Sequence, residues 1–212
     1  MNTIKLGSKG EDVKTLQLIL GMKASGVFDD ETNEAVVEYQ KKNNLDADGI
    51  VGKKTWNVLM KGLPKKSVRK IEYIVVHCTA TPEGQPRTLE QIRQEHVKVN
   101  GWSDIGYNVL VGLNGEIWNG RDVDKIPAHC EGYNKISIGV CYVGGVEYKK
   151  NTPYSKLKAK DTRTPQQKAS LLKVLKDLRK LYPNAKIVGH KDLDKKGKAC
   201  PCFDVVKEYK NI

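Results

Sequence analysis

Two histidines and a cysteine stand where a metal ion could be bound. His77 lies within an apolar run that begins at Ile71, His190 follows the short apolar segment 185–189, and Cys200 comes ten residues later. Imidazole nitrogen and thiolate sulfur are preferred zinc ligands, and three protein ligands leave a fourth position for water. Zinc lowers the pKa of that water to roughly 7, so the set predicts one catalytic Zn2+ per chain. For a single histidine, the alternative to metal binding is a structural role in the core, with its ring nitrogens hydrogen-bonded.

Two further side chains could assist such a metal. Lys198 lies two residues before Cys200, and side chains two apart share one side of an extended chain, so an ammonium group is expected beside the ion. Tyr107, on a neighbouring predicted strand, offers a phenol that can orient the nucleophile or donate to an oxyanion. A hydrolase needs donors aimed at the charge that develops in the transition state. The residue types thus indicate metal-assisted hydrolysis.

The five cysteines are odd in number, which argues for reduced thiols or metal ligation and against a disulfide scaffold. Cys200 and Cys202 have the same parity, so alternation along a strand cannot decide which of them binds the metal. Both together would close the site and exclude water.

An alternating series of strands and helices must position these residues. The run 71–81 is apolar on both parities, which predicts a central strand covered on both faces. Capping-box sequences begin helices at Thr88 and Thr164, and His96 falls on the apolar stripe of the first, where we expect it to pack. Further strands are predicted at 106–111, 116–118, 136–143 and 185–189, and an exposed loop at 147–163. Residues 70–212 therefore predict an α/β domain with a central mixed sheet flanked by helices.

The first sixty residues contain an internal repeat. The segment 26–32 aligns with 49–55 at an offset of 23 residues, and each copy leads from a glycine turn into a helix start. With an earlier helix through Leu16, this predicts a small three-helix domain at 1–62. Residues 63–69 follow a glycine, begin with Leu-Pro and carry several charged side chains. They show no apolar periodicity, which predicts a linker.

The net charge of +12 is unevenly distributed. Residues 1–62 carry 9 basic and 9 acidic side chains, whereas residues 63–212 carry 28 and 16. A basic surface suits an anionic polymer or is simply solvated. No nucleic-acid motif accompanies the charge, so no nucleic-acid partner is expected. No apolar run reaches the length of a membrane span, and no secretory signal is evident, so we expect a protein made in the cytoplasm without membrane insertion. We also expect a monomer.

Two resemblances follow from ordered motifs. The segment 6–17, with Asp48–Gly52 and Thr55–Trp56, resembles the peptidoglycan-binding domain of wall hydrolases. The motifs at 77–81, 101–108, 120–122, 132–134, 137–141, 164–166 and 198–201 resemble, in order, the zinc-dependent N-acetylmuramoyl-L-alanine amidases of bacteriophages, relatives of the peptidoglycan recognition proteins. Together they imply a modular endolysin that cleaves the amide between the muramic lactyl group and L-alanine in bacterial peptidoglycan after release from the host cytoplasm.

The second resemblance also implies roles for individual residues. It implies zinc on His77, His190 and Cys200, with Cys200 chosen because it follows Lys198-Ala199, and catalytic assistance from Tyr107 and Lys198. It implies substrate contacts from Thr79, Tyr133 and Asn134, and from His129 either a substrate contact or a structural role. The interval from His190 to Cys200 and the loop 147–163 are longer than in compact phage members.

Two other classes of function compete with this interpretation. One is a recognition module that binds wall fragments without cutting them, as relatives that lose the thiolate ligand do. The presence of Cys200, Tyr107 and Lys198 argues against it. The other is a nucleic-acid binder, supported by the positive charge alone.

Overall fold

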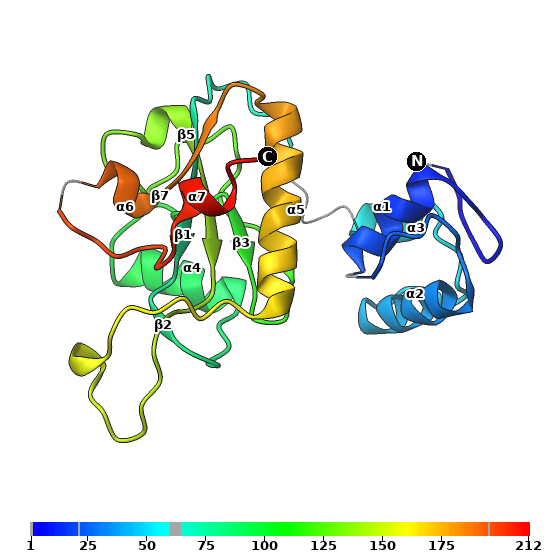
Figure 1. Cartoon of the computed structure of the whole chain (residues 1–212), viewed down its shortest axis with the longest axis horizontal. Helices are drawn as coiled ribbons and strands as arrows, with labels where there is room; N and C mark the ends of the chain where they lie inside the picture. The colour runs from blue at the N-terminus through cyan, green and yellow to red at the C-terminus, as the bar shows by residue number, and fades with distance from the viewer. Residues whose placement is uncertain (1, 21, 60–64, 195) are drawn as a thin grey trace. The chain divides into compact units, whose positions relative to one another are not determined.

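The computed structural model describes residues 2–20, 22–59, 65–194 and 196–212. The chain divides into two compact units, Met1–Lys61 and Gly62–Ile212 (Figure 1). Residues 63 and 64, at the start of the expected linker 63–69, lie outside the described part. Among the described residues, no helix combines the length and apolar composition needed to cross a bilayer.

The described residues of the first unit form three helices, α1 (Glu11–Ile19), α2 (Asp30–Lys42) and α3 (Lys53–Leu59). Asp29 caps α2 by accepting a hydrogen bond from the backbone of Thr32. The helices enclose an apolar core whose buried members are Ile4, Val13, Leu16, Phe28, Val36, Val51, Trp56 and Leu59.

Two buried glutamines, Gln17 and Gln40, make equivalent hydrogen bonds in the two copies of the internal repeat. The Gln17 carboxamide accepts from the Gly26 backbone and donates to Val27 O and to the Thr32 hydroxyl. Gln40, 23 residues later, makes the same three bonds to Gly49, Ile50 and Thr55. Each glutamine thus satisfies the buried polar groups of one glycine turn and ties that turn to the next helix.

A five-stranded mixed sheet with the order β4-β3-β5-β1-β7 organises the second unit (Figure 1). Strands β3 and β4 form the antiparallel hairpin, while β3, β5, β1 and β7 are parallel. Their bounds are β1 Tyr73–Cys78, β3 Val109–Val111, β4 Ile117–Asn119, β5 Ser137–Tyr142 and β7 Lys186–Gly189. Strand β1 lies between β5 and β7 and is buried along nearly its whole length, as its two-sided apolar pattern predicts.

The two faces of the sheet carry different cores. Helix α5 (Pro165–Leu181) packs its buried leucines, Leu171, Leu175 and Leu178, on the face that includes Ile74, Val76 and Tyr142. Helix α4 (Leu89–Lys98) belongs to the core on the opposite face, with Leu110 and Cys141. Both helices begin with the expected capping boxes, at Thr88 and Thr164.

Smaller elements complete the unit. A two-stranded parallel pair joins β2 (Thr81–Pro82) to β6 (Gly145–Val146). Two 3-10 turns occur at η1 (Asn134–Ile136) and η2 (Tyr154–Lys156), and two short helices at α6 (His190–Leu193) and α7 (Val205–Glu208).

Two segments differ from their predicted character. At the end of the predicted linker, Ser67 donates to Val123 O, and the Arg69 guanidinium donates to four backbone carbonyls, so both residues belong to the second unit. At the end of the predicted exposed loop, Thr162 and Arg163 are buried. Composition marks these segments as polar but cannot show that their side chains satisfy buried partners far along the chain.

Candidate metal site

Parallel pairing brings the two predicted histidine ligands together. His77 is the next-to-last residue of β1, and His190 is the first residue after β7. The register pairs Val76 with Gly189, so both imidazoles come from the carboxyl edge of the sheet. Their ring centroids lie 4.5 Å apart, and both rings are buried.

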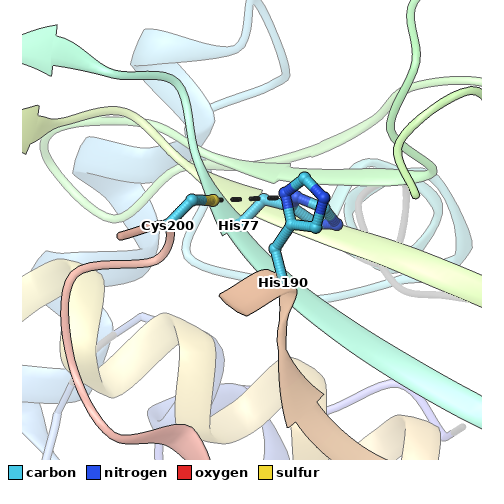
Figure 2. A group of neighbouring side chains, drawn as sticks. All are labelled: His77, His190 and Cys200. Carbon is cyan, nitrogen blue, oxygen red and sulfur yellow. Dashed lines mark hydrogen bonds between the residues drawn. The ribbon is translucent and has the colours of Figure 1, made fainter. Parts of the chain in front are cut away.

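The loop before α7 returns Cys200 to the same point. Its carbonyl accepts a hydrogen bond of 2.8 Å from the Lys191 backbone, which fixes the loop against α6. Its Sγ lies 3.8 Å from His77 Nδ1 (Figure 2). Ligand atoms on one tetrahedral zinc are about 3.6 Å apart for a sulfur and a nitrogen, from the usual bond lengths. The ligand atoms of His77, His190 and Cys200 all lie within 4.8 Å of one another, so the geometry fits one zinc ion.

The electrostatic environment favours neutral imidazoles. Burial is the main cause that lowers the pKa of His77 well below its usual value, and the charges of His129, His190 and Lys198 add to it. Burial, followed by the charge of Lys198, likewise lowers the pKa of His190. A neutral imidazole retains the lone pair that a metal ligand needs.

Cys202 occupies a different environment from Cys200. Its thiol donates to Gly145 O at 3.1 Å and lies 3.8 Å from the Cys78 thiol. Hydrogen bonding with Cys78 and burial raise the pKa of Cys202. Its φ of +73° takes the chain out of the extended conformation, so strand parity does not apply to this pair.

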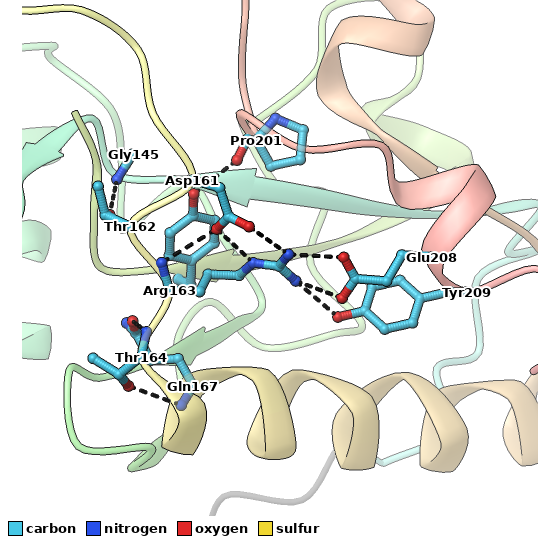
Figure 3. Close-up of polar contacts among 10 residues, drawn as sticks. Gly145, Asp161, Thr162, Arg163, Thr164, Gln167, Pro201, Glu208 and Tyr209 are labelled. Atoms are coloured by element: carbon cyan, nitrogen blue, oxygen red, sulfur yellow. Dashed lines mark hydrogen bonds and ion pairs between the residues drawn. The ribbon is translucent and has the colours of Figure 1, made fainter. Parts of the chain in front are cut away.

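A buried polar network holds the segment that carries Cys200. The Tyr142 hydroxyl donates to Pro201 O at 2.7 Å, and the Arg163 guanidinium stacks on Phe203 at 3.2 Å from the ring centroid. Arg163 also pairs with Asp161 and Glu208, each at 2.8 Å (Figure 3). The ligand loop is thereby fastened to β5, to the end of the 147–163 segment and to α7.

Tyr107 lies beside the first histidine. Its ring centroid is 5.2 Å from that of His77 and 5.4 Å from that of His96. Burial, with the nearby thiols of Cys141 and Cys200, raises the pKa of Tyr107 well above its usual value. The phenol is therefore a neutral hydrogen-bond donor at neutral pH.

Lys198 is exposed. Its positive charge, after burial, contributes to lowering the pKa of both His77 and His190. The Lys198 backbone donates to Asp194 Oδ2 at 3.3 Å, and this bond helps close the loop that follows α6.

Three of the four expected substrate contacts, Thr79, Tyr133 and Asn134, are partly engaged within the protein. The Thr79 hydroxyl accepts from the Gly144 backbone, and Asn134 Oδ1 accepts from the backbones of His129 and Cys130. The Tyr133 ring packs edge-on against Tyr73.

His129 is buried, and both of its ring nitrogens face partners inside the protein. This arrangement favours the structural alternative for this residue. His96 is buried as expected: its Nδ1 accepts from the Gly106 backbone at 3.0 Å.

Sequence reasoning missed Ser137 and Arg163. Ser137 stands at the start of an apolar strand, and its hydroxyl contacts His129. Arg163 stands at the end of a basic segment that resembles a solvated loop. A sequence signal existed for Ser137 alone: the apolar positions around it predict a strand, in which its side chain could be buried.

Comparison with known proteins matches each of the two units to a protein family. The N-acetylmuramoyl-L-alanine amidase family matches residues 67–203, and a peptidoglycan binding domain family matches residues 9–59. The endolysin of Enterobacteria phage K11 is 42% identical over 135 residues, which cover 64% of this chain and 83% of that protein. Peptidoglycan recognition protein 1 of Bos indicus is 30% identical over 154 residues, covering 70% and 76%.

A solved structure supports the same assignment. The Ph2119 endolysin from the Thermus scotoductus MAT2119 bacteriophage Ph2119 superposes with a TM-score of 0.51 at 33% identity, covering 69% of this chain and 88% of that one. Since the family match spans more than half of the chain and includes His77, His190 and Cys200, the chain belongs to the N-acetylmuramoyl-L-alanine amidase family.

Proposed function

We propose that this amidase is zinc-dependent and that His77, His190 and Cys200 bind the metal. The observation that carries the proposal is the convergence of two neutral imidazoles and one thiol within 4.8 Å at the carboxyl edge of the sheet. A zinc ion bound there would supply a hydroxide nucleophile at neutral pH and polarise the scissile carbonyl.

The protein's own side chains would then act on the substrate. The neutral Tyr107 phenol, next to His77, donates a hydrogen bond to the nucleophile or to the oxygen of the lactyl carbonyl as it gains charge. Lys198, whose charge contributes to lowering the pKa of both histidines, would stabilise the same oxyanion. Cleavage releases the amino group of L-alanine from the muramic lactyl group.

We further propose that the first unit supplies affinity for the wall. Its family match and its lack of a buried titratable cluster among the described residues support binding without chemistry. The linked units would raise the effective concentration of the amidase at the polymer. We propose a monomer that is made in the host cytoplasm and reaches the wall after release.

A digest of purified sacculi tests the function. An amidase releases new amino termini without new reducing sugar ends. A recognition protein, the class suggested by the similarity to peptidoglycan recognition protein 1, sediments with the sacculi and leaves them uncut. Release of reducing ends would instead indicate a glycosidase and contradict the proposal.

A further inference from the structure

His129 lies across strand β5 between the zinc ligand His77 and the hydroxyl of Ser137. His129 Nδ1 is 2.8 Å from His77 Nε2, and His129 Nε2 is 3.1 Å from Ser137 Oγ. The Ser137 hydroxyl in turn donates to Tyr133 O at 2.8 Å. These contacts form a continuous series of hydrogen bonds from the backbone carbonyl of Tyr133 to Nε2 of His77.

Counting the protons in this series of hydrogen bonds determines which ring nitrogen of each histidine carries a hydrogen. The single hydroxyl proton of Ser137 is given to Tyr133 O, so Ser137 Oγ must accept from His129 Nε2–H. A neutral His129 then has a bare Nδ1, which accepts from His77 Nε2–H. The remaining nitrogen of His77, Nδ1, is left with its lone pair, and this is the atom that faces Cys200 Sγ.

The contacts of His129 fit its neutral form. The ring is buried, and its two nitrogens face a hydroxyl and a second imidazole, with no carboxylate in either contact to stabilise an imidazolium. A neutral ring has one donor and one acceptor nitrogen, which is what these two contacts require.

The backbone around His129 is built to hold its ring in this place. A Cβ on Gly139 would lie 2.6 Å from His129 Cδ2, so the ring rests on a strand position that only glycine leaves open. Asn134 Oδ1 accepts from the backbones of His129 and Cys130 and fixes the turn that carries the ring. The register places Ser137 and Cys141 on the same face of β5 as Gly139, and pairs Cys141 with His77.

We propose that His129, oriented by Ser137, is a positioning residue that holds His77 as its Nε2–H tautomer and thereby presents Nδ1 to the metal. The inference rests on the proposed zinc site. A hydrogen-bonded second imidazole fixes both the tautomer and the ring orientation of the ligand, and loss of such partners typically weakens metal binding by about 10- to 100-fold.

Three variants separate positioning from mere packing. His129→Leu fills the space but cannot accept from His77. His129→Asn retains an oxygen acceptor near the place of Nδ1. Cys130→Ala, in the same turn, changes a buried side chain that takes no part in this hydrogen-bond chain and serves as the matched control.

Zinc affinity is measured by competition with a chromophoric chelator. We expect about 10- to 100-fold weaker binding for His129→Leu, substantial recovery for His129→Asn and a wild-type value for Cys130→Ala. Ser137→Ala should weaken binding about fivefold, because it removes the acceptor that orients His129. A folded His129→Leu protein with wild-type zinc affinity would overturn the proposal.

The tautomer is read directly from nitrogen-15 NMR of the metal-free wild-type protein, which avoids dependence on any variant folding. We expect the pattern of protonated Nε2 and bare Nδ1 for His77. Protonated Nδ1 would refute the positioning role even if zinc binds. Failure of the wild-type protein to bind zinc, with the expected tautomer present, would instead contradict the proposed function.

Discussion

His77 and Cys200 are 123 residues apart in the chain, yet the Nδ1 of the first lies 3.8 Å from the Sγ of the second. The contact joins strand β1 to the loop before α7 and defines two of the three positions of the candidate zinc site. Cys202, only two residues further on, faces the Cys78 thiol and Gly145 O instead.

This difference predicts opposite outcomes for two serine substitutions. Cys200→Ser should lose zinc and activity together, because a hydroxyl is a poor replacement for a thiolate ligand. Cys202→Ser should keep both, since a serine hydroxyl can still donate to Gly145 O. Elemental analysis and a sacculus digest of both proteins check the prediction. Loss of zinc from Cys202→Ser alone would show that the ligand is misassigned.

Tyr107 and Lys198 are expected to act on the transition state without holding metal. Tyr107→Phe and Lys198→Ala should retain zinc and lower kcat by roughly ten- to a thousandfold, the range seen when an oxyanion donor is removed. Steady-state kinetics on a soluble muropeptide, with metal content measured in parallel, provide the test. A metal-free preparation of either variant would indicate a structural role at the site.

The Arg163 network should make stability depend on acid pH. The hydrogen bond from Arg163 is the main cause that lowers the pKa of Glu208 below its ordinary 4.5. A lowered folded-state pKa means that this stabilisation is fully present above about pH 4.5 and is lost as the pH falls through the folded-state value. Arg163→Met removes both ion pairs and should lower the free energy of unfolding by about 1–3 kcal/mol at pH 7. The loss should be no larger, because both carboxylates remain partly solvated.

Urea unfolding of wild type and Arg163→Met between pH 3 and pH 7 measures this effect. The difference between the two proteins should shrink as the pH falls through the titration of Glu208. A difference that stays constant over the whole range would assign the loss to packing against Phe203 rather than to the ion pairs.

The first unit should contribute affinity and no chemistry. The fragment 62–212 contains the complete sheet, both of its cores and all three clustered ligands. It should cleave a small muropeptide at the full-length rate but bind sacculi more weakly, since tethering is lost. Sedimentation with sacculi and a soluble-substrate assay separate the two quantities. Equal binding by the fragment and the full-length protein would leave the first unit as a spacer.

The sequence predicts the pairing of His77 and His190 because each follows or ends an apolar run that forms a strand. Apolar runs end at His77 and His190, and parallel strands bring their carboxyl ends to one edge, so the pairing needs little further information. The capping boxes at Thr88 and Thr164 are equally local and were confirmed by the observed hydrogen bonds.

Other parts of the site depend on contacts that no local pattern encodes. The position of Cys200 relies on Tyr142 bonding Pro201, 59 residues away, and on Arg163 stacking against Phe203. The relation of Ser137 to His129 relies on a turn fixed by Asn134 and on the space above Gly139. Such residues resemble ordinary strand or loop positions until the fold brings their partners together.

Zinc reconstitution of the full-length protein tests the central claim most directly. Metal-free protein, verified by elemental analysis, is titrated with Zn2+ while the release of amino termini from sacculi is followed. The account predicts no release without metal, a rise in proportion to added zinc and a plateau at one equivalent per chain, consistent with the single His77, His190 and Cys200 cluster found among the described residues. Full activity in the verified metal-free protein would contradict it.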